Sequence, residues 1–389
     1  MRNSPIRRGY TAATANARST PFGRLSPGVS SKHYWHPDFA VKIMPPDETG
    51  WDLTDNPHAA PDKRRPRIAV VYICDRKYHD ITLYSVASIA RCHRYPLCFF
   101  FQQSGYRDAI PPPLAEFLTS RGHSIELLDA PPPGRLAGLK THGEKHRHIS
   151  GTALLKANAI NALARRYDYI LYVDGDTLAF DDIRCEALCG FAETAAVCLD
   201  LAIGTGADDP LVFQRCEDAG ISPFYFNSGF MLINARKWRE TGVLSRFADN
   251  FARHQRKCPY LDPCPTHDQC VFNMTFGGDI VELPMTLNVQ KCAFQTGIWR
   301  DAVLRHYTGP YKFLPVRPWR CDRREYALLR SISRETGLPA PGFYDFGVSY
   351  PLNRLRRRKA VASYERAFAA ATRKYSRISD PALSLFEKG

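Results

Sequence analysis

Two kinds of apolar segment alternate through the middle of the chain. Short continuous apolar runs, of which 68–74 and 169–173 are the clearest, are typical of strands buried on both faces of a parallel sheet. Between them lie longer segments whose apolar residues recur every three or four positions, which is the helical period. This alternation predicts an α/β fold with a mainly parallel central sheet.

The predicted elements follow one another closely. Strands are expected at 68–74, 97–102, 124–128 and 169–173, and helices at 82–92, 111–121 and 153–165. Further along we expect a small-residue turn that leads into an apolar strand within 226–234, then helices at 235–240, 267–276 and 352–375. Ligands of such sheets bind at the carboxyl ends of strands, so the residues after 68–74 and 169–173 are the first candidates for a site.

The two ends of the chain differ from its middle. Residues 1–66 are rich in Arg, Ser and Pro, and no acidic residue precedes Asp38, so this stretch cannot bury enough apolar surface to fold alone. We predict a low-complexity, disordered extension at 1–66, with a targeting role as the alternative. The α/β domain is expected at 67–315 and a basic helical region at 316–389.

The charge of the chain is unevenly distributed. The 53 Lys and Arg residues exceed the 39 Asp and Glu residues, a net charge of +14 that favours anionic partners. From Arg317 onward there are 16 basic and 7 acidic residues, so much of the excess positive charge lies at the end of the chain.

No stacking-aromatic motif of RNA-binding proteins is present, and we therefore expect no nucleic-acid partner. No apolar run reaches the roughly 18–20 residues of a membrane span, which favours a cytoplasmic protein.

The predicted C-terminal helix is amphipathic. Its apolar residues fall at the helical period, and basic residues cluster at its start, between Arg354 and Lys359. The stripe consists of Val361, Tyr364, Phe368, Ala371 and Tyr375. We favour packing of this stripe on the domain. The alternative is attachment to an anionic membrane surface, which would make the protein peripheral at the membrane.

Twelve cysteines are scattered without any CxxC pair, which predicts reduced, partly buried thiols. Cys258, Cys264 and Cys270 recur every six residues, with His254 and His267 nearby. A zinc site at this cluster is the less favoured alternative, because no pair has the usual C-x2–4-C spacing.

Two carboxylates directly follow the strand at 169–173. Asp174 and Asp176 can both turn into the crevice at this strand end, since Gly175 lets the backbone bend. Oxygen ligands of this kind suit Mg²⁺ or Mn²⁺ bound to a diphosphate. The alternative is a solvated turn, in which Asp and Gly are also common.

With its downstream motifs, the chain resembles glycosyltransferase family 8 over about residues 67–315. The resemblance depends on an ordered series of short motifs. The series is Val70 to Tyr78, Tyr172-Val173-Asp174-Gly175-Asp176-Thr177, Tyr225-Phe226-Asn227-Ser228-Gly229, Asp268-Gln269, and the HxGxxK element His306, Gly309 and Lys312. The DxD motif alone is shared by many transferases of the GT-A fold, whereas its combination with HxGxxK is more specific.

The resemblance implies a role for each motif residue. Asp174, Asp176 and His306 would hold Mn²⁺ or Mg²⁺. Asp75 and Tyr78 would contact the nucleotide base, uracil by analogy, while Gly309 and Lys312 would bind the diphosphate. Lys156 would lie near the donor sugar and phosphate, and Asp200, Asn227, Asp268 and Gln269 would contact the donor sugar. The catalytic residues would be Asp268, Gln269 and Lys312.

The resemblance also implies a GT-A fold and an activity. The protein would move a hexose or pentose from a UDP-sugar to a hydroxyl of a glycan, glycolipid or protein acceptor, with retention of anomeric configuration. We favour attack on the same face without a stable covalent intermediate. The alternatives are another GT-A transferase, such as a mannosyl- or xylosyltransferase, and a non-catalytic module that binds nucleotide sugars.

Overall fold

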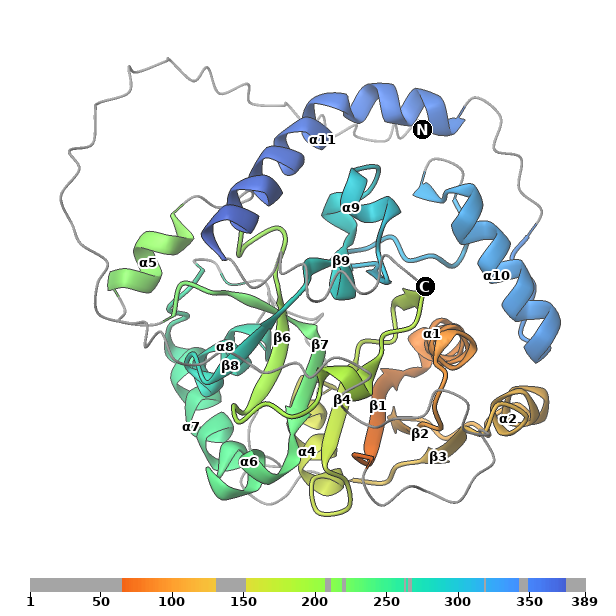
Figure 1. Ribbon diagram of the computed structural model, residues 1–389, viewed down its shortest axis with the longest axis horizontal. Coiled ribbons are helices and arrows are strands. Elements are labelled where there is room, and N and C mark those ends of the chain that lie inside the picture. Colours follow the sequence, from red (N-terminus) through yellow and green to blue (C-terminus); the bar gives the residue numbers. More distant parts are fainter. Residues whose placement is uncertain are drawn as a thin grey trace, which may run out of the picture. The chain divides into compact units, whose positions relative to one another are not determined.

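The central sheet is built from continuous apolar strands. The computed structural model in Figure 1 describes residues 65–130, 152–206, 211–218, 222–261, 264, 268–317, 320–342 and 349–375. The predicted extension lies almost entirely outside these residues. Within them the central sheet has seven strands, in the spatial order β3 (Ser124–Leu127), β2 (Cys98–Ser104), β1 (Ile68–Asp75), β4 (Tyr169–Val173), β7 (Phe226–Asn234), β6 (Ala195–Leu199) and β8 (Ile280–Leu283).

The sheet is mainly parallel, as predicted. Only β7 runs against its neighbours, and it pairs with both β4 and β6. The four predicted strands at 68–74, 97–102, 124–128 and 169–173 correspond to β1, β2, β3 and β4. Every residue of β1 from Ile68 to Cys74 is buried, because layers of helix and loop cover both faces of the sheet.

The turn predicted in the segment that begins at Phe226 is wrong. Residues 226–229 belong to β7, where Phe226 pairs with Leu199 of β6. The Asp174 N–H donates a hydrogen bond of 2.9 Å to the Gly229 carbonyl, so the end of β4 runs beside these residues. Side chains from other segments approach the strand closely at Gly229, as described below.

A second, small sheet was not predicted. It consists of β5 (Thr177–Ala179), β10 (Leu304–His306) and β9 (Val289–Gln290). Strand β10 is antiparallel to β5, with His306 opposite Thr177, and the Tyr307 N–H donates a hydrogen bond of 2.8 Å to the Asp176 carbonyl. This pairing brings the C-terminal part of the domain to the end of β4.

The helices form two groups that contact the sheet. Helix α4 contacts β1, β4, α6 and α7, and α8 contacts α7 and β7. Helix α1 contacts β1, β5 and α10.

All predicted helices are present, with shifts of a few residues at their ends. The helices are α1 (His79–Cys92), α2 (Pro112–Thr119), α4 (Thr152–Leu163), α5 (Val212–Asp218), α6 (Ala235–Glu240), α7 (Val243–Arg256), α8 (Asp268–Phe276), α9 (Gly297–Arg300), α10 (Arg323–Thr336) and α11 (Ser349–Lys374), with 3-10 turns η1 (Arg76–Tyr78), η3 (Cys185–Leu188), η4 (Met285–Asn288) and η5 (Lys291–Ala293).

Helix α10 is held to β10 by buried charge. Arg305 is 1% exposed, and its guanidinium lies 2.7 Å from Asp322 and 3.7 Å from Glu325 at the start of α10. Leu329 and Ile332 of the same helix belong to the main hydrophobic core. Such a pair is costly to break, since loss of either partner would leave the other charge buried.

The apolar stripe of α11 packs against the domain, which confirms the favoured interpretation. Phe368, Ala371 and Tyr375 are buried in the main core, and the ring of Tyr375 meets that of Phe224 edge-on at 5.1 Å. The first turns of the helix are exposed instead. In the described part of the chain no helix is both long and apolar enough to cross a bilayer.

Candidate active site

The two carboxylates after β4 lie at the carboxyl end of the sheet, close to α1. Asp174 accepts a hydrogen bond of 2.6 Å from the Tyr172 hydroxyl, and Asp176 is 8% exposed. A Cβ at Gly175 would lie 2.1 Å from Oγ1 of Thr82, so the backbone between the carboxylates passes directly against α1. A side chain at this position would collide with Thr82, so glycine is the residue that fits between the two carboxylates.

His306 completes the cluster because β10 pairs with β5. Its Nε2 lies 3.1 Å from Oδ1 of Asp176 and 3.6 Å from Oδ2 of Asp174. One ligand atom from each of the three residues lies within 4.8 Å of the others. The ring Nδ1 is 3.1 Å from Oδ1 of Asn288, a contact that orients the ring with Nε2 on the side of the carboxylates.

These three residues fit a divalent cation. Two carboxylates and one imidazole offer mainly hard oxygen ligands, as Mn²⁺ and Mg²⁺ require. The cluster is partly open, because it faces a cavity that could supply the remaining ligands from a diphosphate. The sequence-predicted metal ligands therefore do converge.

Two lysines balance the negative charge of the cluster. Burial acts to raise the pKa of Asp176, but the neighbouring His306 and Lys312 outweigh it and hold the carboxyl well below its usual range. Lys156 lies 3.0 Å from Asp174 and 2.8 Å from Asp268. Burial acts to lower the pKa of Lys156, yet these carboxylates raise it well above the usual value, so the lysine stays charged.

Behind Asp268 a network of amide hydrogen bonds fixes Gln269. Asn227 donates to Oδ2 of Asp200 at 3.0 Å and to Oε1 of Gln269 at 2.9 Å, and Gln269 donates to Asp200 at 3.0 Å. Asp200 is itself held by the backbone N–H groups of Ala202 and Ile203. The three side chains therefore have their positions defined before any ligand binds.

A cavity of about 630 Å³ opens in front of these groups. All predicted site residues line it except Asp75 and Tyr78. Its lining comprises Lys156, Asp174, Asp176, Asp200, Ala202, Ile203, Asn227, Ser228, Leu261, Asp268, Gln269, Gln290, Cys292, His306, Thr308, Gly309 and Lys312. Its volume suits a ligand of nucleotide-sugar size.

The two remaining predicted residues lie at the edge of this site. Asp75 accepts a hydrogen bond of 3.2 Å from the Tyr78 N–H, which caps the 3-10 turn after β1. The Tyr78 ring lies 5.4 Å from Nζ of Lys312. The end of β1 therefore lies next to the end of β4, as expected for neighbouring parallel strands.

Sequence reasoning missed Asn288 and Gln290. Asn288 joins His306 to Asn227 through two hydrogen bonds, and Gln290 accepts one of 2.6 Å from the Leu201 N–H. Both belong to the short segment of η4 and β9, whose role depends on its pairing with β10. No local pattern marks them, because amides at the end of a short strand are unremarkable in sequence.

The comparison with known families decides the relationship. The family model of Glycosyl transferase family 8 matches residues 69–321, which is more than half of the chain. The chain belongs to glycosyltransferase family 8. Its match to the Escherichia coli (strain K12) lipopolysaccharide glucosyltransferase WaaO is 33% identical over 112 residues, covering 27% of this chain and 31% of WaaO. The aligned part thus spans about a third of that relative.

Solved structures of similar fold include two other glycosyltransferases. The galactosyltransferase LgtC, solved with donor and acceptor sugar analogues, has a TM-score of 0.52 at 20% identity, with 75% of this chain and 99% of LgtC covered. The bifunctional glycosyltransferase WbbM has a TM-score of 0.50 at 16% identity, with 71% of this chain and 51% of WbbM covered. These likenesses establish the GT-A fold of this family 8 chain.

Gly229 offers a test of the metal cluster. A Cβ at this position would lie 2.2 Å from Cε1 of His306 and 2.7 Å from Oδ2 of Asp174. We expect Gly229→Ala to displace these ligands and weaken Mn²⁺ binding by about tenfold or more, as loss of ligand orientation does elsewhere. Calorimetric titration with Mn²⁺ measures this.

The matched control is Gly342→Ala, where an added Cβ meets nothing within 4 Å. The control should bind Mn²⁺ like the unmodified protein. Equal Mn²⁺ affinity in both variants would mean that Asp174 and His306 do not share an ion.

Proposed function

We propose that the protein is a metal-dependent glycosyltransferase that moves a hexose from a UDP-sugar to an acceptor hydroxyl, with retention of anomeric configuration. The single observation that carries this proposal is the convergence of Asp174, Asp176 and His306 at a cavity lined by two buried lysines, in a family 8 chain. The ligand class follows from the charges: hard oxygen ligands and lysines together suit a metal-bound diphosphate.

The diphosphate end of the cavity supports departure of the leaving group. A divalent ion, when bound, would stabilise negative charge on the departing nucleoside diphosphate. Lys312 supplies a fixed positive charge at the same place, and the Tyr307 carbonyl, 2.9 Å from its Nζ, holds the ammonium in position. Gly309 has a φ of 79°, in the left-handed region, which lets the loop turn between His306 and Lys312.

The sugar end supports attack without a stable covalent intermediate. The amide of Gln269 is fully engaged with Asn227, Asp200 and the Ser228 N–H, and an amide is a poor nucleophile. The carboxylate of Asp268 is paired with Lys156, which damps its nucleophilicity. In this proposal the negative charge of Asp268 stabilises positive charge on the sugar ring as the bond to the leaving group breaks.

A donor screen tests the proposal. With Mn²⁺ present we expect release of UDP from UDP-glucose or UDP-galactose, and little release from UDP-xylose or GDP-mannose. EDTA should abolish turnover and Mn²⁺ should restore it. Asp176→Ala should lower kcat by about 10²-fold or more, since the metal supplies several kcal/mol of transition-state stabilisation.

The control for this variant is Asp301→Ala, which removes an exposed carboxylate outside the cavity. It should keep normal turnover. Full activity of Asp176→Ala, or of the enzyme in EDTA, would contradict the assignment. Turnover of GDP-mannose or UDP-xylose alone would identify a mannosyl- or xylosyltransferase, and binding of donors without turnover would identify a non-catalytic module.

Lys312→Ala should lower kcat more than it raises KM. Negative charge on the diphosphate increases as the glycosidic bond breaks, so the lysine stabilises the transition state more than the ground state. Steady-state kinetics with the preferred donor measure this. Mn²⁺ titration is the companion measurement, and it should show binding at least as tight, since a cation that competes for Asp176 has been removed. A rise in KM alone would make Lys312 a uniform binding residue.

We further propose that the exposed start of α11 contacts an anionic membrane surface, which would place the enzyme near a lipid-linked acceptor on the cytoplasmic side. The stripe of α11 is buried, but its first turns expose Leu352, Leu355 and several basic side chains. Each basic residue near such a surface contributes about 1 kcal/mol. The test replaces these basic residues by Gln, in a variant altered at Arg354, Arg356, Arg358 and Lys359.

Co-sedimentation with anionic vesicles at low salt should be weakened about 10²-fold or more in this variant. The control replaces four exposed arginines elsewhere, namely Arg67, Arg236, Arg256 and Arg300. Equal sedimentation of both variants would leave α11 as a packing helix only.

A further inference from the structure

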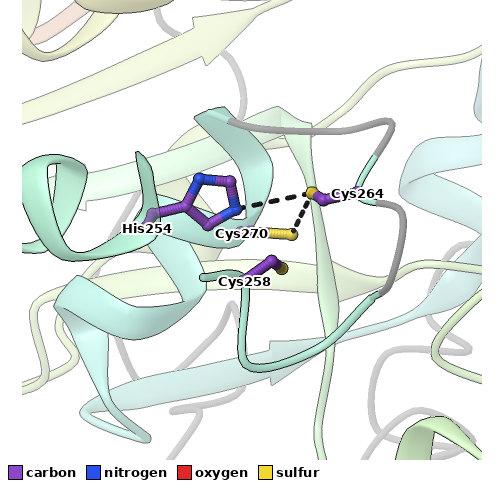
Figure 2. Close-up of side chains that lie close together, drawn as sticks. All are labelled: His254, Cys258, Cys264 and Cys270. Atoms are coloured by element: carbon purple, nitrogen blue, oxygen red, sulfur yellow. Dashed lines mark hydrogen bonds between the residues drawn. The ribbon is translucent and has the colours of Figure 1, made fainter. Parts of the chain in front are cut away.

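Three cysteines and a histidine that the proposed mechanism does not use meet beside the active site. Figure 2 shows His254, Cys258, Cys264 and Cys270 with their side chains directed at a common point. His254 lies in the last turns of α7, Cys270 in the first turn of α8, and Cys258 and Cys264 in the segment between these helices. One ligand atom from each residue lies within 4.8 Å of the other three.

The separations of these atoms match those of a tetrahedral zinc site. Zinc–sulfur bonds of about 2.3 Å at the tetrahedral angle place two sulfurs about 3.8 Å apart, and an imidazole nitrogen about 3.6 Å from each sulfur. Here Nε2 of His254 lies 3.4 Å from Sγ of Cys264, and this sulfur lies 3.5 Å from Sγ of Cys270. The fourth ligand atom, Sγ of Cys258, lies within 4.8 Å of the other three.

We propose that His254, Cys258, Cys264 and Cys270 bind one zinc ion in a closed, structural site. Three thiolates and one imidazole are a common ligand set of structural zinc, and their softness separates this site from the oxygen-rich cluster of Asp174, Asp176 and His306. Binding would release the thiol protons, because the metal takes thiolates and a neutral imidazole.

The surroundings of the four residues are those of a closed site. Cys270 is fully buried in a small hydrophobic cluster with Tyr225 and Tyr260, separate from the main core. The Tyr225 hydroxyl lies 3.0 Å from Sγ of Cys270, and the Leu261 N–H donates to Sγ of Cys258 at 3.4 Å. As donors to thiolates, these groups would orient the ligands as the outer shell of a metal site does.

A bound zinc would also hold one wall of the cavity. Cys270 directly follows Asp268 and Gln269 on α8, and Leu261, which lies between two of the proposed ligands, lines the cavity. The zinc would join the end of α7, the intervening segment and the start of α8 in one cross-link. This positioning role depends on the proposed function, whereas the metal site itself does not.

The cysteines are free and buried or partly buried, as predicted, and the proposal adds a shared zinc ion to three of them. The sequence-based objection was the absence of a C-x2–4-C pair, but the helices bring the ligands together without one. His267, the other histidine near the cluster in sequence, lies outside the described residues.

The zinc content of the purified full-length protein is the first test. Elemental analysis by mass spectrometry should find about one zinc per chain, which stays bound after a brief EDTA treatment that removes Mn²⁺. Cys264→Ala should lose most of this zinc and lower Tm by several degrees. The matched control is Cys216→Ala, which removes a buried thiol of the same small hydrophobic cluster but no ligand, and it should keep the zinc.

Cobalt substitution gives a second readout that needs neither the variant nor the activity. Protein refilled with Co²⁺ should show the intense visible absorption of tetrahedral cobalt and a thiolate-to-cobalt charge-transfer band. The Asp174, Asp176 and His306 cluster has no sulfur ligand and cannot give that band, so this result stands even if the proposed transferase activity fails.

Three outcomes would overturn the site. The first is purified, reduced protein without zinc that also shows no thiolate-to-cobalt band. The second is iron in place of zinc. The third is a disulfide between two of the three cysteines, detected by peptide mapping under non-reducing conditions.

Discussion

Negative charge buried at the carboxyl end of β4 is the constraint on which the rest of the site depends. Asp176 is buried and Asp174 is partly buried, and a carboxylate removed from water is stable only beside positive charge or donors. Lys156 and Lys312 supply that charge from distant parts of the chain, and each touches one of the two carboxylates. The same arrangement lets the site accept a cation and a diphosphate together, because the added charges nearly cancel.

Two structural features position the partners of these carboxylates. The small sheet pairs β10 with β5, so His306 and the loop that carries Lys312 are brought to Asp176. On the other side, α8 presents Asp268 and Gln269, and its next residue is the proposed zinc ligand Cys270. The candidate site residues are therefore held by elements whose other contacts lie outside the cavity, an arrangement that keeps side chains in a defined geometry.

Much of the sheet could be predicted because its signal is local. The strands β1 and β4 are continuous apolar runs, which are typical of strands buried on both faces of a sheet, and the carboxylates directly follow β4. The motif around His306 was found through its fixed spacing to Lys312. Strands β6 and β8 of the central sheet were not predicted, and β5, β9 and β10 were missed because two or three residues carry no periodicity. The segment at 226–229 was misread as a turn, since small residues predict a turn unless the side chains that crowd them are known.

The sequence by itself determined the α/β architecture, the pair of carboxylates that we propose as metal ligands and the amphipathic face of α11, because each depends on neighbouring residues or on a fixed period. Only the tertiary structure decided that Asn288 orients His306, that the stripe of α11 is buried, and that His254 meets three cysteines. These contacts join segments whose relative position is set by the packing of whole elements. The convergence of the cysteines depends on how α7 packs against α8, and no spacing along the chain encodes that arrangement.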